Sequence, residues 1–201
     1  MGAARGVDPQ RDKITLYTSQ TDQVVDRLLK DGVHYVKMEY VAEKYAEAAS
    51  VFLHAYSWYA ENAGRILPRP PQAQSAVWAF CGAQYLDRSP CSQILKLSVP
   101  VESAVFFRMS DWNRILNLQY LGEGPQEQQK FSQKLTRCGA HDELDAYLTP
   151  FYPHLKKEIQ KSWKALFRYD RMVKETGAYT FPDMQAGLWC LKQDWVEQIG
   201  L

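Results

Sequence analysis

The chain has 201 residues, 46% of them hydrophobic and 13% aromatic, which is enough for one domain with a sizeable core. Its formal net charge of +1 excludes an overall field for nucleic acid or membrane, so any such preference must be local. The four cysteines lack metal-ligand spacing, and neither a signal peptide nor an apolar run of the roughly 18 residues that span a membrane is present. We therefore expect a soluble cytoplasmic protein with reduced thiols and no membrane contact.

The first third of the chain alternates strands and helices. Residues 1–12 are polar and predict a disordered tail, and residues 13–201 predict a single domain. A short strand is expected at 14–18, followed by a helix that ends at Gly32, where a left-handed residue would terminate it. "VHYVKM" predicts a second short strand.

A longer amphipathic helix is expected at 41–63, because its apolar residues recur at steps of three and four. These residues are Val41, Tyr45, Ala48, Phe52, Tyr56 and Tyr59.

The rest of the chain places strands before and after a group of helices. "SAVWAF", "ILKLSVP" and "SAVFFRM" predict strands, and "SDWNRILNLQYL" a helix capped by Ser110. Helices follow at 125–137, 141–149 and 154–168, and "MQAGLWCL" predicts a late strand, with a strand or turn in "DWVEQIGL". This order is typical of an α+β fold whose terminal strands meet in one sheet.

Several of these segments resemble a known bacterial family. They are "LYTSQ", "RPPQAQSAVWAF", "LKLSVP", "SDWNRILNLQYL", "IQKSWKALF" and "MQAGLWCLKQDWVEQIGL". In these segments the chain is similar to the family catalogued as domain of unknown function 3841. The resemblance identifies a family of related proteins but does not imply a particular reaction.

The two ends of the chain carry a second, more distant resemblance. "TLYTSQTDQVVDRLLKDGV" resembles the opening strand and helix of the ADP-ribosyltransferase fold, as in DNA-modifying toxins and RNA 2′-phosphotransferases, and "MQAGLWCL" resembles its late strand. The resemblance implies a split antiparallel sheet with helical insertions, in which these two strands lie side by side and grip NAD. Tyr17 and Thr18 would then face the nicotinamide ribose, Gln20 would lie beside them, and Gln185 would orient the ribose.

The chain departs from that pattern at two positions. Thr18 stands where the toxin-like opening has a His or Arg, and Gly187 stands where the late strand offers a catalytic Glu. Loss of one preorganised electrostatic group can cost on the order of 100- to 1000-fold in rate. Asp111 is the carboxylate expected to replace the Glu, if the fold brings it to Gln185.

Each of these residues also has a plainer interpretation. Thr18 and Gln20 fit a strand end with capping side chains, and Gln185 fits an edge position. Trp78 is a candidate for stacking on a ring, and core packing is the alternative. Asp111 and Asn117 are candidates for the same site, or interact with the helix dipole and the local backbone, respectively.

Basic residues recur at helical spacing late in the chain. Lys157, Lys161, Lys164, Arg168 and Arg171 follow steps of four, three, four and three. They predict a cationic face for a phosphate backbone, or simply a solvated helix face.

Two functions from different classes follow. The first is an NAD-binding ADP-ribosyltransferase-like enzyme, a toxin or defence effector that modifies a nucleic-acid or protein acceptor, with an antitoxin partner implied by the resemblance. The second is a non-catalytic nucleotide- or protein-binding module of the same fold. The four scattered histidines lack ligand spacing, so no metal site is expected.

Overall fold

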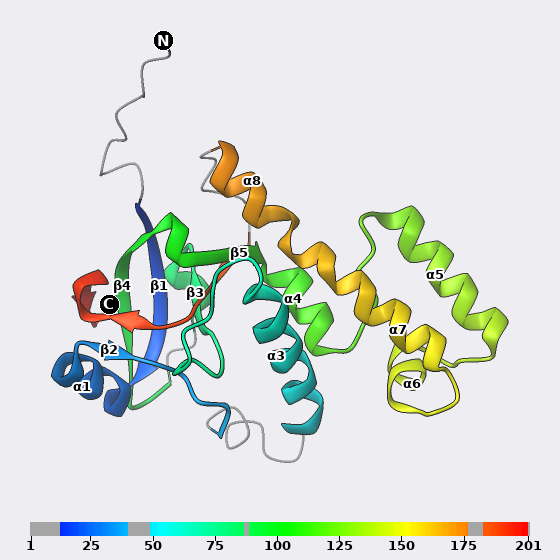
Figure 1. The fold of residues 1–201 in the computed structure, drawn as a ribbon, viewed down its shortest axis with the longest axis horizontal. Coiled ribbons are helices and arrows are strands. Elements are labelled where there is room, and N and C mark those ends of the chain that lie inside the picture. The colour runs from blue at the N-terminus through cyan, green and yellow to red at the C-terminus, as the bar shows by residue number, and fades with distance from the viewer. Residues whose placement is uncertain (1–12, 40–48, 87–88, 177–182, 201) are drawn as a thin grey trace, which may run out of the picture.

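The protein combines an antiparallel sheet with a set of helices that extends away from one face of it (Figure 1). The computed structural model describes residues 13–39, 49–86, 89–176 and 183–200. The predicted tail at 1–12 and the helical positions Val41, Tyr45 and Ala48 lie outside these ranges.

Six strands form one sheet in the order β5-β6-β3-β1-β4-β8, and every pair is antiparallel. Their bounds are Lys13–Thr21 (β1), Val77–Phe80 (β3), Ser92–Pro100 (β4), Ala104–Arg108 (β5), Met184–Leu188 (β6) and Val196–Ile199 (β8). A second sheet pairs β2 (Val33–His34) with β7 (Leu191–Lys192). The α+β class and the common sheet of the terminal strands are thus confirmed.

The helices follow the predicted order. Their bounds are Asp22–Asp31 (α1), Ala49–Ala63 (α3), Met109–Leu116 (α4), Pro125–Cys138 (α5), Glu143–Leu148 (α6), Pro153–Ser162 (α7) and Arg168–Thr176 (α8). Within the described residues, the 3₁₀ turns are Ala83–Tyr85 (η2), Val101–Ser103 (η3), Trp163–Phe167 (η4) and Gln193–Trp195 (η5).

The first strand is longer than predicted. β1 does not stop at Thr18 but pairs with β4 as far as Thr21, which lies opposite Ser92. The following helix ends as predicted at Gly32, whose φ of 75° is left-handed and whose N–H donates to the carbonyl of Leu28 at 2.9 Å.

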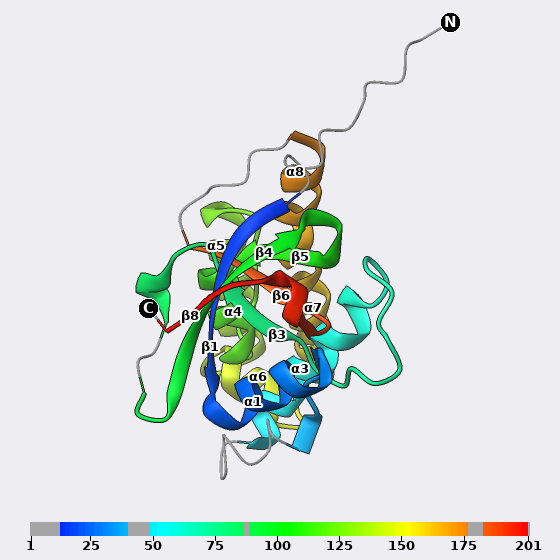
Figure 2. The ribbon, with the colours of Figure 1, turned by 90° about the vertical axis from the view of Figure 1, so that its left-hand side faces the viewer.

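The sheet separates two hydrophobic cores. On one face, Leu16 and Ala186 pack with Leu28 of α1. On the other face, Phe107 packs with Tyr59 of α3 and with helix α4. Figure 2, which views the sheet from the side away from the helical layer, shows α1 on the near side and α4 behind the strands.

The helix expected at 154–168 is present as a succession of α7, η4 and α8. Its predicted apolar face is confirmed, because Leu155, Ile159, Trp163 and Leu166 are all fully buried. The indole N–H of Trp163 donates to the carbonyl of Gln119 at 2.7 Å, which ties this segment to the chain that follows α4.

Candidate functional site

The two strands expected to grip NAD are not neighbours. β3 lies between β1 and β6, and the register places Tyr17 opposite Phe80, and Phe80 opposite Gln185. Two strand spacings therefore separate Tyr17 from Gln185, about 10 Å. The expectation that the first and late strands lie side by side is wrong.

Thr18 and Gln20 form a local pair on the far face of the sheet. The hydroxyl of Thr18, which is 1% exposed, donates to the carbonyl of Trp78 at 2.8 Å and accepts from Nε2 of Gln20 at 2.7 Å. Side chains alternate along a strand, and Tyr17 shares its face with Gln185. Thr18 consequently points away from Gln185, so the two side chains do not line one pocket.

Trp78 belongs to the core. Its indole N–H donates to the hydroxyl of Tyr56 at 3.0 Å, and its ring centroid lies 4.9 Å from those of Tyr59 and Trp112. Core packing, the alternative interpretation, is what the structure shows.

Asn117 makes a local hydrogen bond at the end of α4. It is exposed, and its side chain donates to the carbonyl of Asn113 at 2.7 Å. It bonds the local backbone, as the plainer interpretation expects.

The position of the expected catalytic glutamate is filled from another element. A Cβ atom on Gly187 would overlap the hydroxyl of Tyr59, which is fully buried and has no hydrogen-bond partner among the described residues. Burial raises the pKa of Tyr59 well above its ordinary value, and the charge of Asp170 raises it further. A neutral phenol therefore occupies the space where the resemblance implies a carboxylate.

Gln185 itself is buried beneath the helical layer. It is 3% exposed, and its Oε1 atom has no hydrogen-bond partner among the described residues. One unpartnered oxygen is an incomplete ribose site, because Thr18 is turned away and Trp78 is packed in the core. The residues present do not fit NAD in the way that the resemblance implies.

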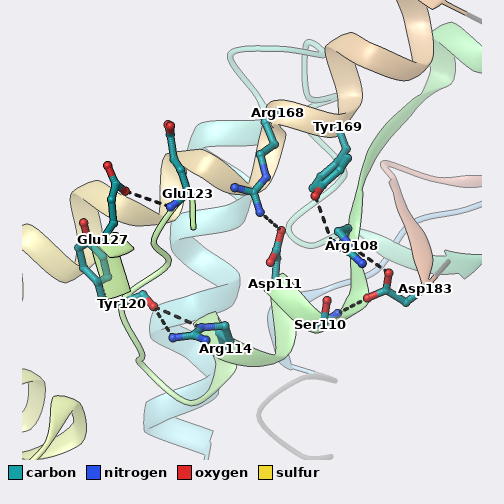
Figure 3. Close-up of polar contacts among 10 residues, drawn as sticks. All are labelled: Arg108, Ser110, Asp111, Arg114, Tyr120, Glu123, Glu127, Arg168, Tyr169 and Asp183. Atoms are coloured by element: carbon teal, nitrogen blue, oxygen red, sulfur yellow. Dashed lines mark hydrogen bonds and ion pairs between the residues drawn. The ribbon is translucent and has the colours of Figure 1, made fainter. Parts of the chain in front are cut away.

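Asp111 is paired with Arg168 rather than with Gln185. Its Oδ2 accepts from the Arg168 guanidinium at 3.0 Å, which ties α4 to the start of α8 (Figure 3). Burial raises the pKa of Asp111, and the positive charges of Arg168 and Arg108 partly offset that effect. Asp111 is thus a largely buried link between two helices.

Of the five basic residues expected on one helix face, three line a common groove, namely Lys157, Lys161 and Lys164. All five are exposed, and Arg168 is held by Asp111. We call Lys157, Lys161 and Lys164 the lysine ridge. Within the described ranges, none of these three ammonium groups has an ion-pair or hydrogen-bond partner.

An open groove of about 500 Å³ runs along one side of the lysine ridge, between α3 and α7, and we call it the α3–α7 groove. Its α3 wall includes Ser57, Trp58, Glu61 and Asn62, and Arg65 lies in the turn that follows α3. Glu61 is the one carboxylate that lines it and is paired with Arg65 at 2.5 Å. Because Glu61 and Arg65 compensate each other, the three lysines of the ridge supply the excess positive charge of this groove.

A second groove, of about 570 Å³, lies on the other side of the lysine ridge. The same three lysines line it, together with the carboxylates of Glu123, Glu127 and Glu158, and we call it the acidic groove. Glu158 forms an ion pair with Lys134, and Glu127 accepts from the backbone N–H of Glu123 at 3.0 Å. The two sides of the ridge thus differ in charge.

The α3 wall of the first groove was not anticipated from the sequence, although a signal is present. His54, Trp58, Glu61 and Arg65 follow steps of four, three and four, and all four line the groove. The lysine ridge and Arg168 follow the same steps. Such spacing marks one polar face in each segment, and the packing of α3 against α7 brings the two faces to one groove.

Within the described ranges, three or more His, Cys, Asp or Glu side chains nowhere gather as a metal ion would require. No helix in those ranges is both long and apolar enough to cross a membrane.

Fold and site together define an α+β protein with an antiparallel sheet and a cationic groove between two helices. The chain belongs to the family described as a domain of unknown function (DUF3841), whose model matches residues 15–197. No curated protein and no solved structure matches the chain.

Proposed function

We propose that this protein binds nucleic acid along the lysine ridge. The observation that carries the proposal is three neighbouring lysines between two grooves, none of which has an ion-pair or hydrogen-bond partner in the part of the chain that the structure describes. Two of the acidic residues that line the grooves are paired with other cations, Glu61 with Arg65 and Glu158 with Lys134, and Glu123 and Glu127 lie on the side of the acidic groove only. Uncompensated ammonium groups in a row attract a phosphate backbone, because binding releases the counterions that surround it.

The dimensions of the lysine ridge suit such a ligand. Seven residues of helix separate Lys157 from Lys164, which corresponds to about 10 Å along the axis. The formal net charge is only +1, so the overall field does not attract a polyanion, and a local row of cations has to supply the attraction. A solvated helix face is the competing interpretation, and binding measurements separate the two.

The proposal takes the non-catalytic of the two functions expected from the sequence. Its support is the position of Thr18, which faces away from Gln185, and the Tyr59 phenol that fills the space beside Gly187. The ADP-ribosyltransferase fold, a protein acceptor and an antitoxin partner stay predictions of the resemblance.

The test is binding of a labelled mixed-sequence oligonucleotide, followed by fluorescence anisotropy over a range of salt concentrations. The variant replaces Lys157, Lys161 and Lys164 with Gln. Each lysine–phosphate contact contributes roughly 0.7 to 0.9 to the slope of log K against log salt. We expect the triple variant to bind at least about tenfold more weakly and to lose about two units of slope.

A matched control removes the same charge elsewhere. Lys13, Lys30 and Lys130 are exposed, and none has an ion-pair or hydrogen-bond partner within the described ranges. Their replacement with Gln is expected to leave the salt slope unchanged. Equal losses in both triple variants, or no binding by the unaltered protein, would refute the proposal.

A further inference from the structure

We infer that the ligand is a single strand lying in the α3–α7 groove, with its bases towards Trp58. The inference rests on the proposed function and adds the strandedness of the nucleic acid and its path. It follows from the unequal charge of the two grooves and from the side chains on the α3 wall.

Charge selects the groove. A strand on the α3–α7 side meets the lysine ridge and Arg65, with Glu61 already paired. On the other side it meets the same ridge next to Glu123 and Glu127. Because like charges at close range repel, the phosphates are expected to follow the first path.

The α3 wall offers groups that contact bases. Trp58 is half-buried: Phe167 stacks on it at 5.7 Å, Trp163 meets it edge-on at 5.4 Å, and the remainder of the ring lines the groove. Base–aromatic contacts tolerate any sequence, since every base has a π face. Asn62 of α3 and Gln160 of α7 also line the groove, where their amide nitrogens donate to the carbonyl of Trp58 and to the hydroxyl of Tyr147, each at 2.8 Å.

The surroundings of the ridge disfavour a duplex. An α-helix that enters the major groove of DNA, about 12 Å wide, must stand clear of its neighbours. α7 does not, because α3 forms the opposite wall of the same groove. Each helix is about 10–12 Å across with its side chains, so the pair is too wide to enter. A duplex would touch only the tips of the lysines, whereas a single strand can lie between the helices.

The first measurement compares a single strand with the duplex of the same sequence by anisotropy at 0.15 M salt, where the screening length is about 8 Å. We expect the single strand to bind at least tenfold more tightly. Equal or tighter binding of the duplex would overturn the inference while leaving the proposed function standing. No binding of either ligand would instead overturn the proposed function.

Two variants with the same charge change locate the path. Ser57 is exposed in the α3–α7 groove, and Glu123 is exposed in the acidic groove. Ser57→Lys and Glu123→Gln each raise the net charge by one. We expect Ser57→Lys to tighten single-strand binding severalfold and Glu123→Gln to leave it unchanged. The reverse order would place the strand in the acidic groove.

Photocrosslinking provides a readout that does not depend on affinity. Each groove has one large aromatic side chain in its lining, Trp58 in the α3–α7 groove and Tyr120 in the acidic groove. A single strand that carries thiouracil, irradiated on the unaltered protein, is expected to give adducts in the peptide that contains Trp58. Adducts confined to the peptide of Tyr120 would overturn the inference.

Discussion

At the scale of single residues, the contact between Gly187 and Tyr59 explains why the late strand carries a glycine. The Tyr59 ring is fully buried among aromatic side chains, with centroid distances of 4.9 Å to Trp78 and 5.6 Å to Phe107. A rigid ring in such a cluster has little room to move when a neighbour grows. The glycine is therefore a packing requirement of the α3 face.

Gly187→Ala is expected to destabilise the protein by about 1–3 kcal/mol, because the added methyl group overlaps the Tyr59 hydroxyl. The measurement is urea unfolding followed by circular dichroism. Unchanged stability would mean that the phenol is not fixed in this position.

The double variant distinguishes this contact from a general effect on β6. Tyr59→Phe removes a buried hydroxyl that has no hydrogen-bond partner among the described residues, so we expect it to be neutral or slightly stabilising. In its presence, Gly187→Ala should cost less than in the unaltered protein. Additive effects of the two changes would contradict the proposed contact.

At the scale of elements, α4 starts on a carboxylate supplied by a distant part of the chain. Ser110, the predicted cap, lies inside the first turn instead, and its N–H donates to Oδ2 of Asp183 at 3.1 Å. The other oxygen of Asp183 accepts from Nε of Arg108 at 3.0 Å, and its backbone carbonyl accepts from the N–H of Met109 at 2.8 Å (Figure 3). Prediction of Ser110 as the cap was wrong because the actual cap lies more than seventy residues away.

Asp183→Asn should lower the free energy of unfolding by about 1 kcal/mol at neutral pH. It should also make the free energy of unfolding fall less steeply as the pH is lowered into the acid range. Burial alone would raise the pKa of Asp183, but hydrogen bonds from Ser110 and Arg108 outweigh it and lower the pKa below the ordinary 3.8. The unfolded chain therefore binds the proton first, and the contribution of Asp183 is lost as the pH falls through 3.8 and below. Asn keeps the preference for the positive φ of 58° but lacks the charge.

The measurement is the free energy of unfolding by urea between neutral pH and the acid limb. Asp26→Asn is the matched control, because Asp26 is exposed on α1. It should keep the pH dependence of the unaltered protein. An Asp183→Asn variant with an equally steep acid limb would show that this carboxylate does not carry the effect.

The elements were largely predictable because their signals are local. Helical spacing of Leu155, Ile159 and Trp163 fixes a buried face, and Gly32 fixes a helix end. The break into α7, η4 and α8 was not predictable, since that segment has no Gly or Pro to mark it. Contacts between distant segments, such as the hydrogen bond from the Trp163 indole to the Gln119 carbonyl, have no local sequence pattern that predicts them.

At the scale of the whole molecule, the order of strands was the part beyond reach of the sequence. Each strand pattern predicts a strand and its buried face but not which strand lies beside it. Because β3 lies between β1 and β6, Tyr17 and Gln185 are on strands that are not neighbours. The lysine ridge could be predicted from the spacing of residues along one segment. The groove beside it could not, because it depends on the packing of α3 against α7.

The strand order leads to a prediction about NAD. A nicotinamide ribose held from both sides needs two facing walls, and here Thr18 faces one side of the sheet while Gln185 faces the other, the side of Phe107. We therefore expect the purified protein to release no nicotinamide from NAD above the buffer rate, measured by chromatography, and to give no binding heat in calorimetric titration.

If the protein does release nicotinamide, two variants identify the residues that are responsible. If nicotinamide is released, the Gln185→Ala variant tests whether the late strand is responsible, and the ridge variant with Lys157, Lys161 and Lys164 replaced by Gln tests the acceptor surface. Loss of release in Gln185→Ala, with release retained in the ridge variant, would restore the enzymatic hypothesis. It would also require Gln185, now 3% exposed, to become accessible through a movement of the helical layer above it. Because that layer includes α3, one wall of the α3–α7 groove, such a movement would couple the two sites, and bound oligonucleotide should then change the rate of release.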